Sequence, residues 1–585
     1  MRLSDYWGVG PKTRAVLEES IGAEAAITAI EGADVGTLVD AGLSAGRATR
    51  ICRRARPNAD LSVLATGDVR TVYRAVLSLI VDHAVTDETA DRIRVLAPLT
   101  STDAMRERLD RIDAIREAWE AQPAATREAA LASFAEYDEA GGGELAAVRT
   151  ALDLRDIGLT DGPFASLAAF DADRLRETEV ALAGLDEGRV REGVDERLDE
   201  YRAEVAAVED LAADPAGIVA DLRESGVRDS DDFREALVEH VVGETGVEYV
   251  AVREAAPADA IDATSFVDGL LRTLVSERRT IAEERAADVA DGLRATVNEA
   301  RSDVDAAVEA VRDVALFLSL ARFATAYDLT RPRIVDDRDA VAVAGARSLS
   351  LSAAGEDVQP VTYALGEHGL DDDGTWTVAP SGDRVTVLTG ANSGGKTTLL
   401  ETLCETVLLA HMGVPVPAER AEVSPLDAIV FHRRHASFNA GVLESTLRTI
   451  VPPLVEGGRT LMLVDEFEAI TEPGSAADLL HGLVTLSVDR EALGAFVTHL
   501  AEDLEPLPDA ARVDGIFAEG LDENLELAVD YQPRFGTLGR STPEFIVSRL
   551  VAEAGDREVR VGFEALAEAV GEEAVQRTLA DVPET

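Results

Sequence analysis

The sequence predicts a multidomain protein that is α-helical to about residue 330 and mixed α/β from there to residue 545. At 585 residues the chain is too long for a single compact core. Residues 61–327 are rich in Ala, Glu, Arg and Leu, and their apolar side chains recur three and four positions apart, which is the period of an amphipathic helix. After Pro332, short Val- and Leu-rich runs alternate with helical segments, a pattern that predicts a largely parallel sheet covered by helices.

Residues 1–56 are expected to form a small helical unit with two glycine turns, at residues 7–13 and 41–47. Glycines spaced around an apolar residue between short helices resemble the helix-hairpin-helix motif, whose backbone N–H groups hold a DNA phosphate without reading the bases. The alternatives are that the glycines only end helices, or that the unit contacts a protein. The residues predicted to contact DNA are Gly8, Gly10, Lys12, Gly42, Gly46 and Arg47.

The long helical stretch is expected to divide into a core, residues 57–200, and an arm, residues 201–330. One long helix is predicted to open over residues 189–202 and a second to run over residues 265–323. Between them the run 247–252 predicts a short strand. Two helices that run outward and back, with a small insert at the tip, would form a lever and a clamp. An ordinary helical bundle has the same periodicity and remains open.

A phosphate-binding loop is predicted within the α/β part, residues 331–545. A buried strand at 385–388 leads into a Gly-x-x-x-x-Gly-Lys-Thr run and then a helix, which is the context that makes this motif specific. The loop N–H groups and the helix dipole hold phosphates, while the lysine reaches the β- and γ-phosphates and the threonine hydroxyl faces Mg²⁺. We therefore expect ATP with Mg²⁺. The predicted binding residues are Gly390, Ala391, Asn392, Ser393, Gly394, Gly395, Lys396, Thr397 and Thr398.

Two further apolar runs end in side chains suited to phosphate chemistry. The first ends in Asp465 and Glu466, and the second in His499. The carboxyl ends of parallel strands form the sites of α/β proteins, so Asp465 is expected to hold Mg²⁺ with Thr397 and Glu466 to polarise the attacking water. The predicted catalytic residues are Lys396, Glu466 and His499. The competing interpretation is that strand-end acids are common in so acidic a chain and that a lone histidine is an ordinary strand-end residue.

The charge balance is strongly acidic, with 110 acidic and 56 basic residues and a formal net charge of −54. The acids are spread along the whole chain, which predicts a solvated acidic surface suited to the molar intracellular salt of an extreme halophile. Only two lysines occur, Lys12 and Lys396; the other cationic residues are arginines. A phosphate loop requires a compact ammonium, which explains one of the two positions.

Composition also limits the cellular setting. No apolar run reaches the roughly 18 residues that span a bilayer, so no membrane partner is expected. The N-terminus lacks the apolar segment of a secretory signal, and Cys52 and Cys404 lack metal-ligand spacing. These observations predict a reduced, cytoplasmic location.

Several of these motifs resemble those of the MutS family. Asn392, Gly394 and Gly395 are similar to the Gly-Pro-Asn-x-Gly-Gly-Lys loop, with Ala391 in place of proline. The strand ending in His499 resembles Phe-Ala-Thr-His, which makes His499 the counterpart of a histidine that senses the γ-phosphate. Further resemblances cover the Arg-Pro turn into the ATPase, the start of the helical core and the end of the ATPase; they lie at residues 331–334, 96–110 and 535–545.

The resemblance implies an ABC-type ATPase over residues 331–545 and a helical C-terminal dimerisation element, residues 546–585. Family members complete one subunit's site with a signature loop from the other, which implies a homodimer. The segment that resembles this loop contains Ser437, Asn439 and Gly441, with Asn439 in the position of the family's serine. If Phe438 is matched to the family's phenylalanine instead, Ala436 takes that position. We find neither the domain with which mismatch readers wedge a phenylalanine beside the mispaired base nor a Smr nuclease domain.

The function implied is an ATP-dependent clamp that binds double-stranded or branched DNA without sequence preference, in repair or recombination. It would hydrolyse ATP to ADP and phosphate slowly, with DNA modulating the rate. One alternative is an SMC-like or other ABC-type ATPase, although the Leu-Ser-Gly-Gly-Gln signature of that class does not occur in the sequence. The other is a scaffold that ATP switches with little hydrolysis.

Overall fold

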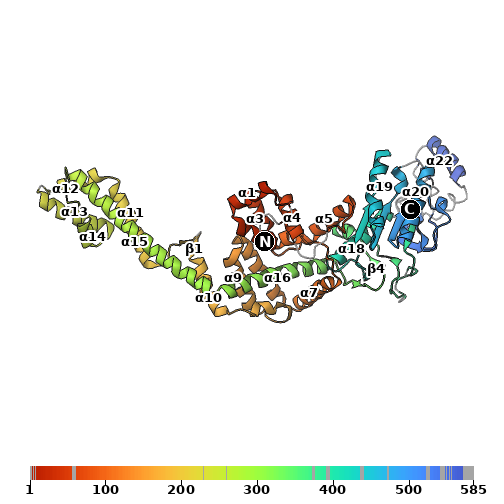
Figure 1. Cartoon of the computed structure of the whole chain (residues 1–585), viewed down its shortest axis with the longest axis horizontal. Helices are drawn as coiled ribbons and strands as arrows, with labels where there is room; N and C mark the ends of the chain where they lie inside the picture. Colours follow the sequence, from red (N-terminus) through yellow and green to blue (C-terminus); the bar gives the residue numbers. More distant parts are fainter. Residues whose placement is uncertain are drawn as a thin grey trace. The chain divides into compact units, whose positions relative to one another are not determined.

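The structure, a computed structural model, divides the chain into two compact units, residues 1–135 with 312–585 and residues 136–311 (Figure 1). The described residues are all those outside 1–2, 4–5, 7, 56–60, 187, 228, 259, 372–373, 375, 378, 391–394, 435–439, 471–472, 522–526, 540–546, 548–549, 552–553, 555–556 and 571–585.

Four short helices near the N-terminus enclose an apolar core of their own. Leu17, Ile30, Leu38 and Ile51 are among its buried side chains. Val95 belongs to the same cluster and joins this unit to the helices that follow. The four helices are α1 (Pro11–Ser20), α2 (Ala23–Gly32), α3 (Val35–Asp40) and α4 (Ala45–Ala55).

A six-stranded sheet forms the centre of the α/β part, in the order β12-β11-β6-β10-β9-β8. Its pairings are parallel except for the antiparallel β11–β12 edge, so the prediction of a largely parallel sheet is confirmed. All residues of β6, β9 and β10 are buried, which explains their continuous apolar sequence. The strands are β6 (Val385–Gly390), β8 (Ala428–His432), β9 (Thr460–Asp465), β10 (Leu493–Val497), β11 (Ala511–Leu521) and β12 (Leu527–Phe535).

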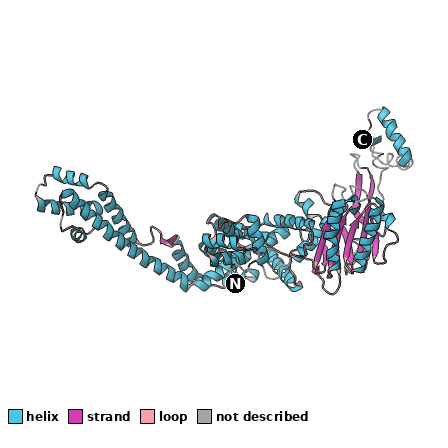
Figure 2. Cartoon of the chain, turned by 45° about the horizontal axis from the view of Figure 1, so that its top comes forward, coloured by secondary structure: helices cyan, strands magenta, loops and turns pink. Residues whose placement is uncertain are grey.

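Helices flank this sheet, as Figure 2 shows. The helix after β6 is buried along nearly its whole length, and the opposite sheet face packs on Leu480, Leu483 and Val484. The helices of this part are α17 (Leu349–Ala353), α18 (Lys396–His411), α19 (Ala440–Val455), η3 (Phe467–Ile470), α20 (Pro473–Asp489), η4 (Ala501–Leu504) and, after the sheet, α22 (Arg557–Val570).

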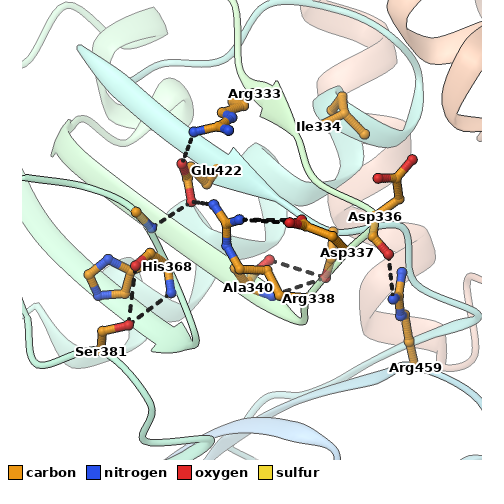
Figure 3. A network of polar contacts seen from close by, with 12 residues as sticks. Arg333, Ile334, Asp336, Asp337, Arg338, Ala340, His368, Ser381, Glu422 and Arg459 are labelled. Atoms are coloured by element: carbon orange, nitrogen blue, oxygen red, sulfur yellow. Dashed lines mark hydrogen bonds and ion pairs between the residues drawn. The ribbon is translucent and has the colours of Figure 1, made fainter.

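A second sheet, not predicted from the sequence, has four strands in the order β3-β7-β4-β5. The apolar run 341–344, expected in the parallel sheet, lies instead in β4 of this sheet and pairs antiparallel with β5 and β7. Buried Glu422 accepts hydrogen bonds from Arg333 at 3.1 Å, Arg338 at 2.8 Å and the Gly369 N–H at 2.8 Å (Figure 3). Burial acts to raise the pKa of Glu422, but the Gly369 N–H and Arg338 together hold it below the ordinary value. The strands are β3 (Arg333–Ile334), β4 (Ala340–Ala346), β5 (Val361–Gly366) and β7 (Arg420–Val423).

The segment before α5 extends the large sheet at the β8 edge. Ala65 N–H donates to the Ile429 carbonyl at 3.1 Å, and Ile429 N–H donates to the Val63 carbonyl at 2.7 Å. The Thr66 hydroxyl donates to the Phe431 carbonyl at 2.7 Å. The start of the predicted helical core is therefore hydrogen-bonded to the α/β part. The helices that follow are α5 (Gly67–Val81), α6 (Asp87–Arg94), α7 (Thr102–Glu120) and α8 (Ala124–Glu139).

The second unit contains an arm of two antiparallel helices, α11 (Glu196–Ala212) and α15 (Ala263–Glu299) (Figure 1). Asp195 pairs with Arg285 at 2.5 Å and Glu204 with Arg278 at 3.4 Å, so the two helices run in opposite directions. Three short helices pack on the start of α15 around one apolar cluster, the tip cluster, which includes Val252, Phe266 and Leu270. They are α12 (Pro215–Glu224), α13 (Ser230–Thr245) and α14 (Tyr249–Glu254). The remaining elements are α9 (Gly143–Asp156), η2 (Gly162–Ala168), α10 (Ala172–Ala183), β1 (Leu185–Asp186) and β2 (Arg189–Val190).

For this part of the chain, the predicted strand and the predicted single helix over 265–323 are wrong, and the predicted start of the first arm helix is imprecise. The helix expected from residue 189 begins at Glu196, because Gly193 has a φ of +84° and Asp195 caps the helix by accepting from Leu198 N–H. The strand expected over 247–252 is helix α14, whose Val252 is buried in the tip cluster. Tertiary packing here overrides the strand preference of Val and Tyr. The helix expected over 265–323 is two helices, α15 and α16 (Arg301–Ala326).

Cys52 and Cys404 are both buried and free. In the described part of the chain, no helix combines the length and apolarity needed to cross a bilayer.

Candidate functional site

Three parallel strands bring the predicted phosphate, metal and histidine positions to one sheet edge. Val497 of β10 lies opposite Leu388 of β6 and opposite Asp465 of β9. Glu466 N–H donates to the Val497 carbonyl at 3.0 Å, and Thr498 N–H donates to the Leu388 carbonyl at 3.1 Å. The loop after β6, the carboxylates after β9 and the histidine after β10 are therefore neighbours at the carboxyl edge of the sheet.

The turn from β6 into α18 depends on two glycines. Gly390 has a φ of +131°, and a Cβ there would lie 2.2 Å from the Ile516 carbonyl oxygen. Gly395 caps α18 with a φ of +69°, and a Cβ there would lie 2.8 Å from the Tyr531 ring. The Lys396 ammonium donates to the Gly390 carbonyl at 2.8 Å. The four predicted residues between the glycines, Ala391, Asn392, Ser393 and Gly394, lie outside the described residues.

Thr397 and Asp465, the predicted metal ligands, are in contact. The Thr397 hydroxyl donates to Asp465 Oδ2 at 2.8 Å. Asp465 is 2% exposed, and its Oδ1 has no hydrogen-bond partner among the described residues. Burial raises the pKa of Asp465, while the Thr397 hydroxyl acts to lower it. A buried carboxylate oxygen beside a hydroxyl suits Mg²⁺, which takes few protein oxygens and completes its octahedron with water and phosphate.

Glu466 and His499 are also in contact. His499 Nε2 lies 3.3 Å from Glu466 Oε1, and the His499 N–H donates to Glu468 Oε1 at 2.6 Å. The second oxygen of Glu466, Oε2, lies 2.7 Å from an Arg434 guanidinium nitrogen. Glu466 has a φ of +43°, a backbone conformation that is uncommon outside glycine and that clusters at functional sites. Sequence reasoning missed Arg434 and Glu468, which carry no motif of their own.

Acidic side chains dominate the surroundings of Lys396. Burial lowers the pKa of this lysine, while Glu466, Asp465 and Glu468 act to raise it. Because three carboxylates face one buried ammonium, the protein alone offers little net positive charge to a phosphate chain.

A cavity of about 360 Å³ opens beside the start of α18. Lys396, Thr397 and Thr398 line one side, and Gln359 and Tyr531 line another. Tyr531 is 41% exposed, and its backbone N–H donates to Gln359 Oε1 at 3.2 Å. A cavity of this size accommodates a small ligand. Gln359 and Tyr531 were not predicted, because they lie far from the loop in sequence and only the fold brings them to it.

The predicted signature loop is only partly placed. Ser437 and Asn439 lie outside the described residues, and Gly441 lies in the first turn of α19. Its role stays a prediction.

The two glycine turns of the N-terminal unit lie against each other. Gly8 and Gly42 have φ values of +83° and +97°, a conformation that favours glycine. Gly10 precedes α1, and Lys12 is exposed in the first turn of that helix. Arg47, which follows Gly46 at the start of α4, donates to the Gly8 carbonyl at 3.3 Å. The structure thus brings the helix start after the second turn against the first turn.

Comparison with known proteins points to one family. Residues 386–451 match MutS domain V. A 204-residue segment is 47% identical to the DNA-binding protein MutS2 of Pyrococcus furiosus, covering 35% of this chain and 35% of that protein. The Endonuclease MutS2 of Solidesulfovibrio magneticus is 30% identical over 239 residues, covering 40% of this chain and 28% of that protein. The DNA mismatch repair protein MutS 2 of Halobacterium salinarum is 29% identical over 357 residues, covering 56% and 37%. The chain therefore matches 28% to 37% of the length of these three relatives.

Proposed function

We propose that this chain, which belongs to the MutS family, is an ATPase that binds double-stranded DNA and couples ATP hydrolysis to opening and closing around it. The observation that carries the proposal is the contact between Thr397 and Asp465, next to a glutamate that reaches a histidine from the neighbouring strand.

The chemistry assigned to the site follows from its geometry. The triphosphate would lie at the start of α18, where the helix dipole and Lys396 favour negative charge. Thr397 and Asp465 would hold Mg²⁺, which supplies positive charge to the phosphates. Glu466 would accept a proton from the water that attacks the γ-phosphorus, the bond to the ADP oxygen would break, and His499 would contact the γ-phosphate. Tyr531, which lines the cavity, would stack on the base.

The DNA part of the proposal rests on the N-terminal unit and on the relatives. The P. furiosus relative is described as DNA-binding, and two glycine turns with exposed cations suit sequence-independent phosphate contacts. The DNA would be double-stranded or branched. We further propose a homodimer in which each subunit's loop around Ser437 and Asn439 completes the other's nucleotide site. The acidic surface and the H. salinarum relative support a halophilic setting.

One contact favours the second candidate, a scaffold that ATP switches with little turnover. Arg434 pairs with the oxygen of Glu466 that does not face His499, and an engaged carboxylate is a poorer base. The two functions differ in whether turnover depends on Glu466.

The test is ATP turnover at high salt with Mg²⁺, measured with and without a DNA duplex. We expect duplex to change the rate, and Glu466→Gln to lower it by about a hundredfold or more, the usual worth of a general base. The matched control is Glu502→Gln, an exposed glutamate outside the site. Turnover that survives Glu466→Gln would contradict the hydrolytic role, and turnover absent from the native chain would favour the scaffold.

A further inference from the structure

A groove between α4 and α5 is lined by arginines. Its volume is about 690 Å³, and none of the described residues that line it is acidic. The chain has 110 acidic and 56 basic residues, so a described lining without a carboxylate is unexpected on composition alone. The arginines are Arg50, Arg53, Arg54, Arg70 and Arg74.

Four of these arginines differ from others in the chain because they have no acidic partner among the described residues. Arg331, for example, pairs with Asp110 at 2.7 Å and with Asp113 at 2.9 Å. Within the described part of the chain, four groove arginines form no ion pair with a carboxylate; they are Arg50, Arg53, Arg70 and Arg74. A cationic hollow without internal counter-charge favours an external polyanion.

Backbone carbonyls orient some of these side chains without neutralising them. Arg53 donates to the Arg94 carbonyl at 2.5 Å and lies over the Tyr73 ring, 5.0 Å from its centroid. Arg74 Nε donates to the Arg70 carbonyl at 3.0 Å. The Arg53 Nε is buried and has no hydrogen-bond partner among the described residues. Backbone contacts therefore hold Arg53 and Arg74 in place, while no described carboxylate pairs with either of them.

The aromatic ring of the groove is not available to nucleobases. Tyr73 is 1% exposed, and its hydroxyl donates to the Leu96 carbonyl. Burial raises the pKa of Tyr73 to about 12, so its hydroxyl keeps its proton. Proteins that hold single strands stack bases on exposed aromatic rings. Here the ring is buried and arginines line the groove. This arrangement suits the phosphates of a duplex, whose bases are stacked on one another.

We propose that this groove binds the sugar–phosphate backbone of double-stranded DNA, as a contact additional to the two glycine turns. The proposal rests on the proposed function, since it adds a second DNA contact to the same chain. Arg47, Arg50 and Arg54 are spaced three and four residues apart on α4 and so share one face of the helix. This face leads from the second glycine turn, at Gly46, into the groove that Gly46 also lines.

The test compares two double variants with equal loss of charge. Arg50→Gln/Arg74→Gln removes one exposed arginine from each groove helix. Arg149→Gln/Arg176→Gln removes two arginines of α9 and α10 that pair with Glu179 and Asp156, each at 2.9 Å. Binding of a short fluorescent DNA duplex is measured without nucleotide over a series of KCl concentrations at which circular dichroism shows the variants folded.

We expect the groove variant to reduce the slope of log affinity against log salt by about 2, one unit for each phosphate that the variant no longer neutralises. Its affinity at the lowest salt should fall by about tenfold, and the control pair should match the native chain. An unchanged slope in the groove variant, or equal weakening in both variants, overturns the proposal. Equally tight binding of single-stranded DNA or of polyglutamate through the same arginines also overturns it.

A third variant separates the two proposals. If Lys12→Gln/Arg47→Gln weakens duplex binding while the groove variant does not, the groove assignment fails and DNA binding by the glycine turns stands. If the duplex binds through the groove but never alters ATP turnover, the groove assignment stands and the ATP-coupled function fails. If the native chain binds no duplex at any salt concentration, both fail.

Discussion

The nucleotide site and the arginine groove both present cations to phosphate, but they do so in opposite ways. At the nucleotide site one buried ammonium, Lys396, lies among Asp465, Glu466 and Glu468. The described lining of the groove has five arginines and no carboxylate. Among the described residues, carboxylates outnumber the ammonium at the first site, whereas every charged residue that lines the second is cationic.

This difference predicts what each site requires. A triphosphate that enters a site rich in carboxylates needs Mg²⁺ to offset the repulsion, and Asp465 has a free oxygen for it among the described residues. A duplex backbone in the groove needs no metal. The cation also differs between the two sites. A phosphate loop requires a compact ammonium, which Lys396 supplies, whereas the planar guanidinium groups of the groove suit the phosphates of a DNA backbone.

The largest expected effect comes from Lys396→Arg. Its side chain is 4% exposed and already contacts the Gly390 carbonyl, so a longer, planar group has no room. We expect ATP turnover to fall by about a hundredfold or more, a loss of roughly 3 kcal/mol in transition-state binding. Lys12→Arg, at the only other lysine, is the matched control for turnover. If Lys396→Arg turns over ATP within threefold of the native rate, the nucleotide site does not require an ammonium, and it does not differ from the groove in this respect.

The next largest effect is expected from removal of Mg²⁺, which should weaken the nucleotide site but not the groove. With EDTA in place of Mg²⁺, we expect fluorescent ATP analogue binding to weaken by about tenfold or more, because the phosphates then face Asp465 and Glu466 without a counter-ion. Duplex binding in the absence of nucleotide should not change. Loss of duplex binding in EDTA would show that the groove depends on a metal as well.

At the C-terminal end of α18, burial changes the pKa of His411. The groove lining contains no histidine among the described residues. His411 is 2% exposed, its Nε2 accepts the Leu426 N–H at 3.2 Å, and burial lowers its pKa to about 4. The folded chain therefore keeps His411 neutral, whereas the unfolded chain protonates it below about pH 6.5. The contribution is complete above pH 6.5 and is lost as the pH falls towards 4.

Between pH 7 and pH 5 this histidine should lower the free energy of unfolding by about 2 kcal/mol. Denaturant unfolding of the native chain and of His411→Gln at both pH values measures the difference. The variant should lose less stability on acidification. The same loss in both proteins would mean that His411 is not held neutral.

The smallest expected effect concerns Arg434, the cation nearest the proposed base. Its side chain is 59% exposed, so its 2.7 Å pair with Glu466 is worth no more than about 1 kcal/mol. Arg434→Ala should raise basal turnover about two- to fivefold by releasing Glu466. Arg448→Ala removes an exposed arginine that pairs with Glu444, and it should leave turnover unchanged. Slower turnover in Arg434→Ala would indicate that this arginine assists hydrolysis.

Local sequence predicted much of the site because parallel strands end at a common edge. The runs before Asp465 and His499 were identified as strands, and their pairing brings these residues to the turn that contains Gly390. Arg434 and Tyr531 could not be predicted in this way, because each reaches the site through tertiary contacts that leave no periodic or motif signal. Glu468 lies only two residues after Glu466, but its contact with the His499 N–H depends on the neighbouring strand.

The fold shows the same division. The largely parallel sheet followed from its apolar runs, whereas the second sheet, with its Glu422 network, did not. The true start of α11 could have been predicted from the sequence, because Gly193 is a turn residue and Asp195 is a helix cap. Helix α14 was not, because Val and Tyr favour strands and only burial of Val252 in the tip cluster selects the helix.

The most direct test of the account is a titration of ATP turnover with DNA duplex, in Mg²⁺ at high salt, beside a binding curve for the same duplex. We expect turnover to change and to saturate at the duplex concentration that saturates binding. We also expect Glu466→Gln to bind the duplex normally but to show no such change in turnover. Turnover that stays constant while the duplex becomes fully bound would contradict the proposal that ATP hydrolysis and DNA binding are coupled in this chain.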